Sequence, residues 1–401
     1  MSARRSRHPL GGRAAVTGTP PRRALALLLA TAAALGVAGT VPAAAAPSAG
    51  PKDDVRAGLE RLVKEDRYPA AMAAVSGPDG RVRNYTAGVA DLRTGAKVPV
   101  DGQVRAGSNT KTFVAAVVLQ LVGEGKVELD APIDRYLPGL VRGEGIDGRV
   151  ITVRQLLQHT SGLPNFTDDI FDAVFGEGRH RYYQPRELVD MALAHKALFA
   201  PGTDWSYSNT NYILAGLLIE KITGRPLAEQ LTKRVIDRIG LRHTYFPAVG
   251  DEGIREPHPH GYTVRPDGSL SDVTDLDPSW GWAAGQLIST PGDLNRFFSA
   301  LMGGRLLKPA QLAEMRTTVK VPDGPGVPKG EEHGLGLIRR PLSCGKVVWG
   351  HGGATPGFHT FPGVTEDGRA VTVAVTANLA PSPQGAEHAQ ALFDEALCAK
   401  R

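Results

Sequence analysis

Segments with strand character lie at both ends of this chain, and segments with helical spacing fill its middle. The runs 71–76 and 82–89 flank the turn sequence Gly-Pro-Asp-Gly at 77–80, and 371–376 is a further strand near the other end. Helical spacing marks 55–62, 109–124, 153–158, 186–195, 210–222, 227–239, 292–302, 309–315 and 384–399, and short apolar runs at 334–338, 346–349 and 358–361 indicate strands. Because strands need partners, we expect the two ends to meet in one sheet.

The predicted fold class is therefore α/β of the α+β type. An antiparallel sheet flanked by helices is built from about 55–120 and 290–401, and an all-helical subdomain at about 121–289 is inserted into it. A cleft between the two parts is a common place for a site. The catalytic domain is expected to span 47–401.

The first fifty residues resemble a secretory signal. Six arginines without any Lys, Asp or Glu precede or flank a mostly apolar run at 24–41, and small residues follow at 43–46. We predict a signal peptide at 1–46 and a secreted, extracellular protein; an uncleaved anchor is the alternative. The whole chain has a net charge of +5. Without these six arginines it has 40 basic and 41 acidic residues, so the rest of the chain has no excess of positive charge that would indicate nucleic-acid binding.

The chain contains two cysteines, Cys344 and Cys398. In an exported protein an even count favours a disulfide, which would tie the last helix to a C-terminal strand. Two separate buried thiols are the alternative.

Ser108 and Lys111 stand three residues apart at the start of the predicted helix 109–124, so they share one face. A serine hydroxyl is a weak nucleophile until a base takes its proton, and a buried lysine beside a helix N-terminus has a depressed pKa. Gly107 allows a tight turn into the helix. Alone, the pair is equally compatible with a helix-capping serine and a solvated lysine.

Two further elements strengthen the pair. Tyr207 and Asn209 precede the helix 210–222: a phenol near Lys111 would serve as general base and acid, and an amide would hold substrate. His351, Gly352 and Gly353 follow a strand, where glycine permits close approach of a substrate backbone and the Ala354 N–H, with that of Ser108, would form an oxyanion hole. His351 would add a donor or a positive charge. Taken alone, each element is better explained as an ordinary polar loop or turn.

Taken together, S-x-x-K, Y-x-N and H-x-G in this order resemble the penicillin-recognising serine hydrolases, and most closely the secreted D-alanyl-D-alanine carboxypeptidases of the class C β-lactamase-like branch. The similarity extends from about Val55 to the C-terminus and includes the segments 105–108, 151–155, 159–163 (His-Thr-Ser-Gly-Leu), 207–211 and 342–345.

The resemblance implies a role for each position. Ser108 would form the acyl-enzyme, Lys111 and Tyr207 would share acid–base work, and Asn209, His351, Gly353 and Ala354 would bind substrate. Phe171 and Trp280 match aromatic residues of the substrate cleft, with core packing as the alternative, and Cys344 and Cys398 match a disulfide pair. His159 matches a structural segment and is interpreted as a structural histidine.

One part of the family pattern is missing. The relatives bind the free carboxylate of a terminal D-alanine with an arginine and two threonines, and those positions are Ile338, Gly352 and Ala354 here. Arg339 would point to the opposite face of the strand, and Arg340 shares the face of Ile338 two residues away. We expect the acylating chemistry to be retained and carboxylate recognition to be weakened.

The sequence thus predicts a secreted serine D-peptidase of the D-alanyl-D-alanine carboxypeptidase type, acting on D-residue peptides such as peptidoglycan stem peptides. An esterase, a D-aminopeptidase, a β-lactamase or a penicillin-binding module without turnover are the alternatives. The expected ligands are small peptides, esters or β-lactams. We expect the protein to be a monomer. We expect no cofactor, no metal, no nucleic acid and no membrane span after signal cleavage.

Overall fold

The computed structural model describes residues 51–399 except 79, 323, 325–326 and 379–380, so the predicted signal peptide lies outside the described residues. Within them, ten strands form one antiparallel sheet in the order β10-β11-β12-β13-β15-β16-β1-β2-β3, with β14 also paired to β15. The strands are β1 (Ala70–Ser76), β2 (Val82–Asp91), β3 (Ala96–Lys97), β10 (Val319–Lys320), β11 (Glu332–His333), β12 (Ile338–Pro341), β13 (Val347–Gly350), β14 (Gly353–Thr355), β15 (Phe358–Thr365) and β16 (Ala370–Val375). The ends of the chain meet as predicted, because Ala73 of β1 lies opposite Val373 of β16.

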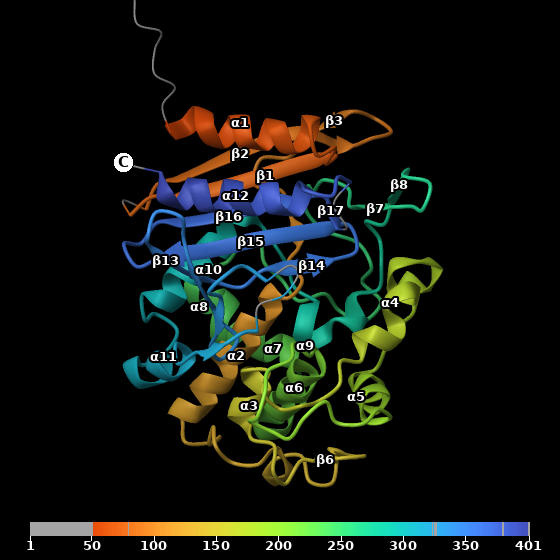
Figure 1. The fold of residues 1–401 in the computed structure, drawn as a ribbon, viewed down its shortest axis with the longest axis vertical. Helices are drawn as coiled ribbons and strands as arrows, with labels where there is room; N and C mark the ends of the chain where they lie inside the picture. The colour runs from red at the N-terminus through yellow and green to blue at the C-terminus, as the bar shows by residue number, and fades with distance from the viewer. Residues whose placement is uncertain (1–50, 79, 323, 325–326, 379–380, 400–401) are drawn as a thin grey trace, which may run out of the picture. The chain divides into compact units, whose positions relative to one another are not determined.

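Helices cover both faces of this sheet. α1 (Pro51–Lys64) and α12 (Gly385–Cys398) pack on one face, and α10 (Pro291–Met302) packs on the other (Figure 1). β16 is buried on both sides and shows the period-2 alternation of a strand: Val371, Val373 and Val375 join the core under α1 and α12, and Thr372 donates a hydrogen bond to Asn295 of α10 at 2.7 Å.

The segment between the two halves of the sheet is mainly helical, as predicted. It contains α2 (Asn109–Gly123), α3 (Val153–Leu157), α4 (Thr167–Phe175), α5 (Pro185–Leu193), α6 (Thr210–Thr223), α7 (Leu227–Leu231), α8 (Asp237–Ile239) and α9 (Trp282–Gly285), and α11 (Pro309–Met315) follows α10. The predicted helix at 227–239 is interrupted by a π turn at Thr232–Ile236. None of the helices in the described part of the chain is long and apolar enough to cross a membrane.

Short strands also occur outside the main sheet. β4 (Val104–Arg105) pairs with β9 (Ile288–Ser289), β5 (Arg142–Gly143) with β6 (Ile146–Asp147), and β7 (Tyr262–Val264) with β8 (Leu270–Asp272), while β17 (Ala377–Asn378) runs parallel to β7. The β4–β9 pair lies just before the helix that carries Ser108, so it fixes where α2 begins.

The strand predicted at 334–338 is wrong in its position. Residues 334–337 form the turn between β11 and β12, closed by a hydrogen bond from Gly334 N to Leu337 O at 2.7 Å, and Gly336 has a φ of 68°. A Cβ on Gly336 would lie 2.6 Å from that of Ala115 and 2.7 Å from the Tyr212 hydroxyl. The turn is therefore packed into the helical part, and the strand starts only at Ile338.

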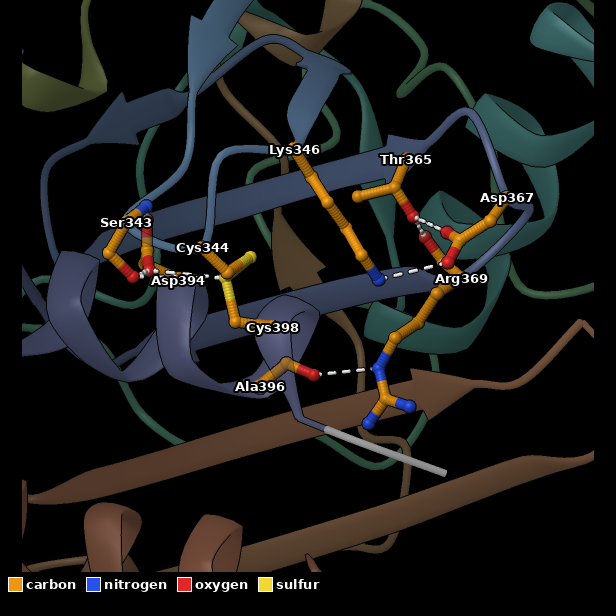
Figure 2. The surroundings of a disulfide bond; sticks show 9 residues. All are labelled: Ser343, Cys344, Lys346, Thr365, Asp367, Arg369, Asp394, Ala396 and Cys398. Carbon is orange, nitrogen blue, oxygen red and sulfur yellow. Dashed lines mark hydrogen bonds and ion pairs between the residues drawn. A yellow bond between two sulfur atoms is a disulfide. The ribbon is translucent and has the colours of Figure 1, made fainter.

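The predicted disulfide is present. Cys344, in the turn before β13, is bonded to Cys398 at the end of α12, with Cα atoms 5.8 Å apart and a sequence separation of 54 (Figure 2). Asp394 of α12 accepts hydrogen bonds from the Ser343 backbone and hydroxyl beside it, and Arg369 donates to the Ala396 carbonyl at 2.7 Å. The C-terminal helix is thereby fastened to the sheet at several points.

Replacing both cysteines with alanine should destabilise the fold while leaving the site assembled. Closing a loop of this length removes chain entropy worth about 4 kcal/mol from the unfolded state, and native side-chain contacts offset part of its loss. We expect the free energy of unfolding, measured in urea, to fall by about 2–4 kcal/mol. Unchanged stability in the double variant relative to the oxidised protein would contradict this.

Candidate functional site

Ser108 is held at a tight turn between β4 and α2. Gly107 adopts a φ of 54°, and the Thr110 hydroxyl donates to its carbonyl at 2.7 Å. Just upstream, the buried Arg105 side chain donates to the backbone carbonyls of Thr274 and Glu252, which fixes the strand. Ser108 occupies the N-cap position, but its side chain makes no capping hydrogen bond. The helix-cap alternative for Ser108 is therefore not observed.

Lys111 is completely buried and meets Ser108, as the spacing predicts. Its Nζ lies 2.9 Å from Ser108 Oγ, 2.7 Å from Asn209 Oδ1 and 2.8 Å from the Ala284 carbonyl. Burial holds the pKa of Lys111 well below its usual value. Two of the three partners only accept hydrogen bonds, so a neutral amine donates its two hydrogens to them and leaves its lone pair for the serine hydroxyl.

Tyr207 contacts both Ser108 and Lys111. The phenol hydrogen bonds with the Ser108 side chain, and Lys111 Nζ lies 5.0 Å from the centre of the ring. Burial raises the pKa of Tyr207 above its usual value, and the hydrogen bond with Ser108 only partly opposes that rise. The phenol is therefore held in its neutral form, which favours Lys111 over a tyrosinate as the group that first takes the serine proton.

His159 supports the ring of Tyr207 by stacking against it. The two rings stack with centroids 4.4 Å apart, and His159 Nδ1 accepts hydrogen bonds from Ser208 N and Asn211 Nδ2, each at 3.2 Å. Burial holds the pKa of His159 well below its usual value, so the ring is neutral. The structural interpretation of His159 fits this position, but the sequence did not reveal that the residue it supports is Tyr207.

Asn209 connects Lys111 to the helical part. Its Oδ1 accepts from Lys111 and its Nδ2 donates to Thr167 at 3.2 Å, in the first turn of α4. Phe171 lies one turn further on α4, on the same face as Thr167, and is 46% exposed with its ring stacked on Phe175. Core packing therefore does not explain Phe171, and its role in the cleft stays a prediction.

Trp280 precedes α9, the helix that supplies the Ala284 carbonyl to Lys111. Its ring packs partly against the main core, and its indole nitrogen is buried without a partner among the described residues. This combination leaves both the packing and the cleft interpretation of Trp280 open.

Gly353 and Ala354 bring β14 against the Ser108 turn. A Cβ on Gly353 would lie 2.0 Å from the Ala106 carbonyl oxygen and 2.3 Å from Asn109 Nδ2, and one on Gly107 would lie 2.8 Å from Ala354 N. Gly353 thus admits the protein's own backbone rather than, as predicted, a substrate backbone. The close contact places the Ala354 backbone beside Gly107, the residue before Ser108, and the oxyanion role of the Ser108 and Ala354 N–H groups stays a prediction.

The positive charge considered for His351 is not supported. His351 is buried, its Nδ1 donates to the Gly352 carbonyl at 2.7 Å, and its Nε2 has no partner among the described residues. Burial and the nearby Lys111 lower the pKa of His351 to about 3. The ring is a neutral hydrogen-bonding group next to Tyr207, whose ring centroid is 6.3 Å away.

A buried polar group that the sequence analysis did not single out lies beside His351. His333 stands with its ring centroid 6.4 Å from that of His351 and 4.8 Å from that of Trp205. Its Nε2 lies 2.9 Å from Glu331, and Glu331 also pairs with Arg340. Its place at the site depends on the β11–β12 hairpin, so no local sequence pattern reveals it.

Across the residues that the structure describes, no three His, Cys, Asp or Glu side chains gather in a way that would hold a metal ion.

Comparison with known proteins agrees with this geometry. Residues 55–397 match the beta-lactamase family, and the chain belongs to it. It is a penicillin-recognising serine hydrolase. Penicillin-binding protein 4 of Amycolatopsis lactamdurans is 27% identical over 317 residues, 77% of each chain.

Two solved structures are also similar. The D-stereospecific amidohydrolase from Streptomyces sp. is 39% identical with a TM-score of 0.78, covering 87% of this chain and 99% of its own. The D-amino acid amidase from Ochrobactrum anthropi SV3 is 28% identical with a TM-score of 0.77, covering 87% and 98%. The fold and the family are thus the predicted ones.

Replacing Gly107 with alanine should disable the site without unfolding the protein. The new Cβ would lie 2.8 Å from the Ala354 backbone, and φ at this position is in the left-handed region, which costs about 1–2 kcal/mol for other residues. We expect the rate of serine acylation by a p-nitrophenyl ester to fall at least roughly tenfold, as misplacement of reacting groups does. Gly285→Ala is the matched control, because its Cβ would find its nearest atom at 3.8 Å.

The pH dependence of acylation should report Lys111 rather than His351. As pH falls through the lowered pKa of Lys111, the amine gains a proton and loses the lone pair that receives the serine proton, so kcat/KM for an ester without titratable groups should fall. His351 is already neutral far above its pKa of about 3. We therefore expect His351→Gln to lower the rate but to leave the midpoint of the acid limb in place; a displaced midpoint would contradict the assignment.

Proposed function

We propose that this protein is a D-stereospecific serine amidohydrolase that cleaves amide bonds following D-residues through a covalent ester on Ser108. The observation that carries the proposal is the buried contact between Lys111 Nζ and Ser108 Oγ. The three hydrogen-bond partners of Lys111 in the described part of the chain are a hydroxyl, an amide oxygen and a backbone carbonyl, and none of them carries a charge. A neutral amine at that position makes the serine a nucleophile near neutral pH.

The proposed reaction is acyl transfer to water. Ser108 Oγ attacks the substrate carbonyl and its proton passes to Lys111, while the Ser108 and Ala354 N–H groups stabilise the oxyanion. As the C–N bond breaks, Tyr207 gives its hydroxyl proton to the leaving nitrogen and recovers one from Lys111. Water then attacks the ester by the same path in reverse, which releases the acid and restores Ser108.

Preference for D-residues is supported by the two similar structures, which are a D-stereospecific amidohydrolase and a D-amino acid amidase. The carboxypeptidase subtype has less support, because Ile338, Gly352 and Ala354 offer no side-chain donor for a substrate carboxylate. Export of the mature domain, a monomeric state and action on peptidoglycan peptides stay predictions, and the disulfide is compatible with an extracellular location.

Mass spectrometry of the intact protein, combined with turnover assays, tests this function. With D- and L-phenylalanine amide, we expect turnover of the D form at least roughly tenfold above the L form, since the enantiomers place different groups at the oxyanion donors. A β-lactam should leave an adduct on Ser108, and Ser108→Ala should remove both the adduct and the turnover. An adduct on another residue, or equal rates for the two enantiomers, would sink the proposal. A stable stoichiometric adduct with no amide turnover would instead indicate a penicillin-binding module.

A further inference from the structure

The β11–β12 hairpin carries two arginine–glutamate pairs on opposite faces. Antiparallel register places Glu332 opposite Arg339 and His333 opposite Ile338, so Glu331 and Arg340 follow as the next pair outward. Because side chains alternate, Glu331, His333, Ile338 and Arg340 share the face that meets His351. Arg339 and Glu332 lie on the other face, 3.6 Å apart.

Arg340 lies two residues from Ile338, the position that matches the carboxylate-binding arginine of similar carboxypeptidases. It shares a face with Ile338, which occupies that position, and its side chain is only 17% exposed. Its guanidinium is already occupied, because Nε lies 3.0 Å from Glu331 Oε2 and a second nitrogen contacts the same oxygen. The Glu331 carboxylate thus occupies the guanidinium group of Arg340 that a substrate carboxylate would otherwise bind.

Glu331 is well placed to act on the site. It is 8% exposed, and its other oxygen lies 2.9 Å from His333. Its negative charge adds to the rise in the pKa of Tyr207 that burial causes, and it opposes the lowering of the pKa of His351. Burial acts to raise the pKa of the Glu331 carboxyl, but the hydrogen bond with His333 and the pairing with Arg340 outweigh it and hold the pKa below its usual value, so the group is ionised. A substrate carboxylate beside Arg340 would therefore face an ion pair without net charge and would gain little electrostatic attraction from it.

We propose that Glu331 is a specificity-determining residue: by holding Arg340, it makes the leaving-group side of the cleft electrically neutral and selects substrates whose leaving group has no free carboxylate. Amides, amines and alcohols fit such a subsite, whereas a C-terminal D-amino acid does not. The inference rests on the proposed function of Ser108 and adds the substrate class on the leaving-group side.

The test compares kcat/KM for a D-Ala-D-Ala peptide with that for its C-terminal amide in wild type and variants. Glu331→Gln keeps the size of the side chain and removes its charge, so Arg340 becomes free to pair with the substrate. We expect the acid-to-amide ratio to rise by roughly tenfold or more, mainly through a lower KM for the acid, as charge-assisted pairing predicts. Glu332→Gln removes the same charge from the opposite face and should leave the ratio unchanged.

Two further variants guard against a purely structural effect. Arg340→Met leaves Glu331 negative and should move the ratio in the opposite direction, below that of wild type. The double variant Glu331→Gln/Arg340→Met should return it to the wild-type value. A folded Glu331→Gln protein with an unchanged ratio overturns the inference. If that variant does not fold, an unchanged ratio in Arg340→Met does so.

The failure of this inference and that of the proposed function are distinguishable. If wild type cleaves the amide and the acid-to-amide ratio of kcat/KM is the same in wild type and in Glu331→Gln, only the specificity inference is wrong. If wild type acylates Ser108 with neither peptide, the proposed function itself falls.

Discussion

The burial of Lys111 beside Ser108 is the constraint on which the rest of the site depends. An ammonium group removed from water without a carboxylate is costly, and the cost is avoided when the amine gives up its proton. The surrounding structure supplies only neutral acceptors, Asn209 Oδ1 and the Ala284 carbonyl, which hold the amine in place without restoring its charge. The reactivity of Ser108 therefore depends on the buried position of Lys111, which keeps the amine neutral.

Several distant parts of the chain are needed to build that environment. α2 is buried along nearly its whole length, so its first turn cannot shift without disturbing the core. α9, α6 and β14 each bring one group to that turn, and these elements are separated by long stretches of sequence. The sheet formed from both chain ends and the helices inserted between them are what hold the three together. The disulfide and the contacts of Asp394 and Arg369 fasten α12 to the face of the sheet away from the site.

Much of this was predictable from the sequence, because period-2 and period-3.6 patterns are local. The meeting of Ser108 with Lys111 also follows from helix geometry alone. The failures have a common cause in tertiary contact. The apolar run at 334–338 looks like a strand, yet Gly336 must turn there to fit against Ala115 and Tyr212. His351 looked like a candidate for positive charge, and only its burial shows it to be neutral. Neither the pairing of Glu331 with Arg340 nor the stacking of His159 on Tyr207 has a local signature.

The site therefore divides into two halves that obey different constraints. The acylating half is bound by the geometry of one helix turn, and every group it needs has a partner that fixes it: Ser108 against Lys111, Lys111 against Asn209, and Tyr207 against His159. The half that receives the leaving group rests on a hairpin at the end of the sheet, where one charge pair decides what is bound. The hydrogen-bond partners of Glu331 are His333 and Arg340, so we expect changes in this pair to affect which leaving group is bound more than the acylating chemistry. In this protein the reactive serine would then serve any substrate that reaches it, and the charge balance of the hairpin would select among the leaving groups.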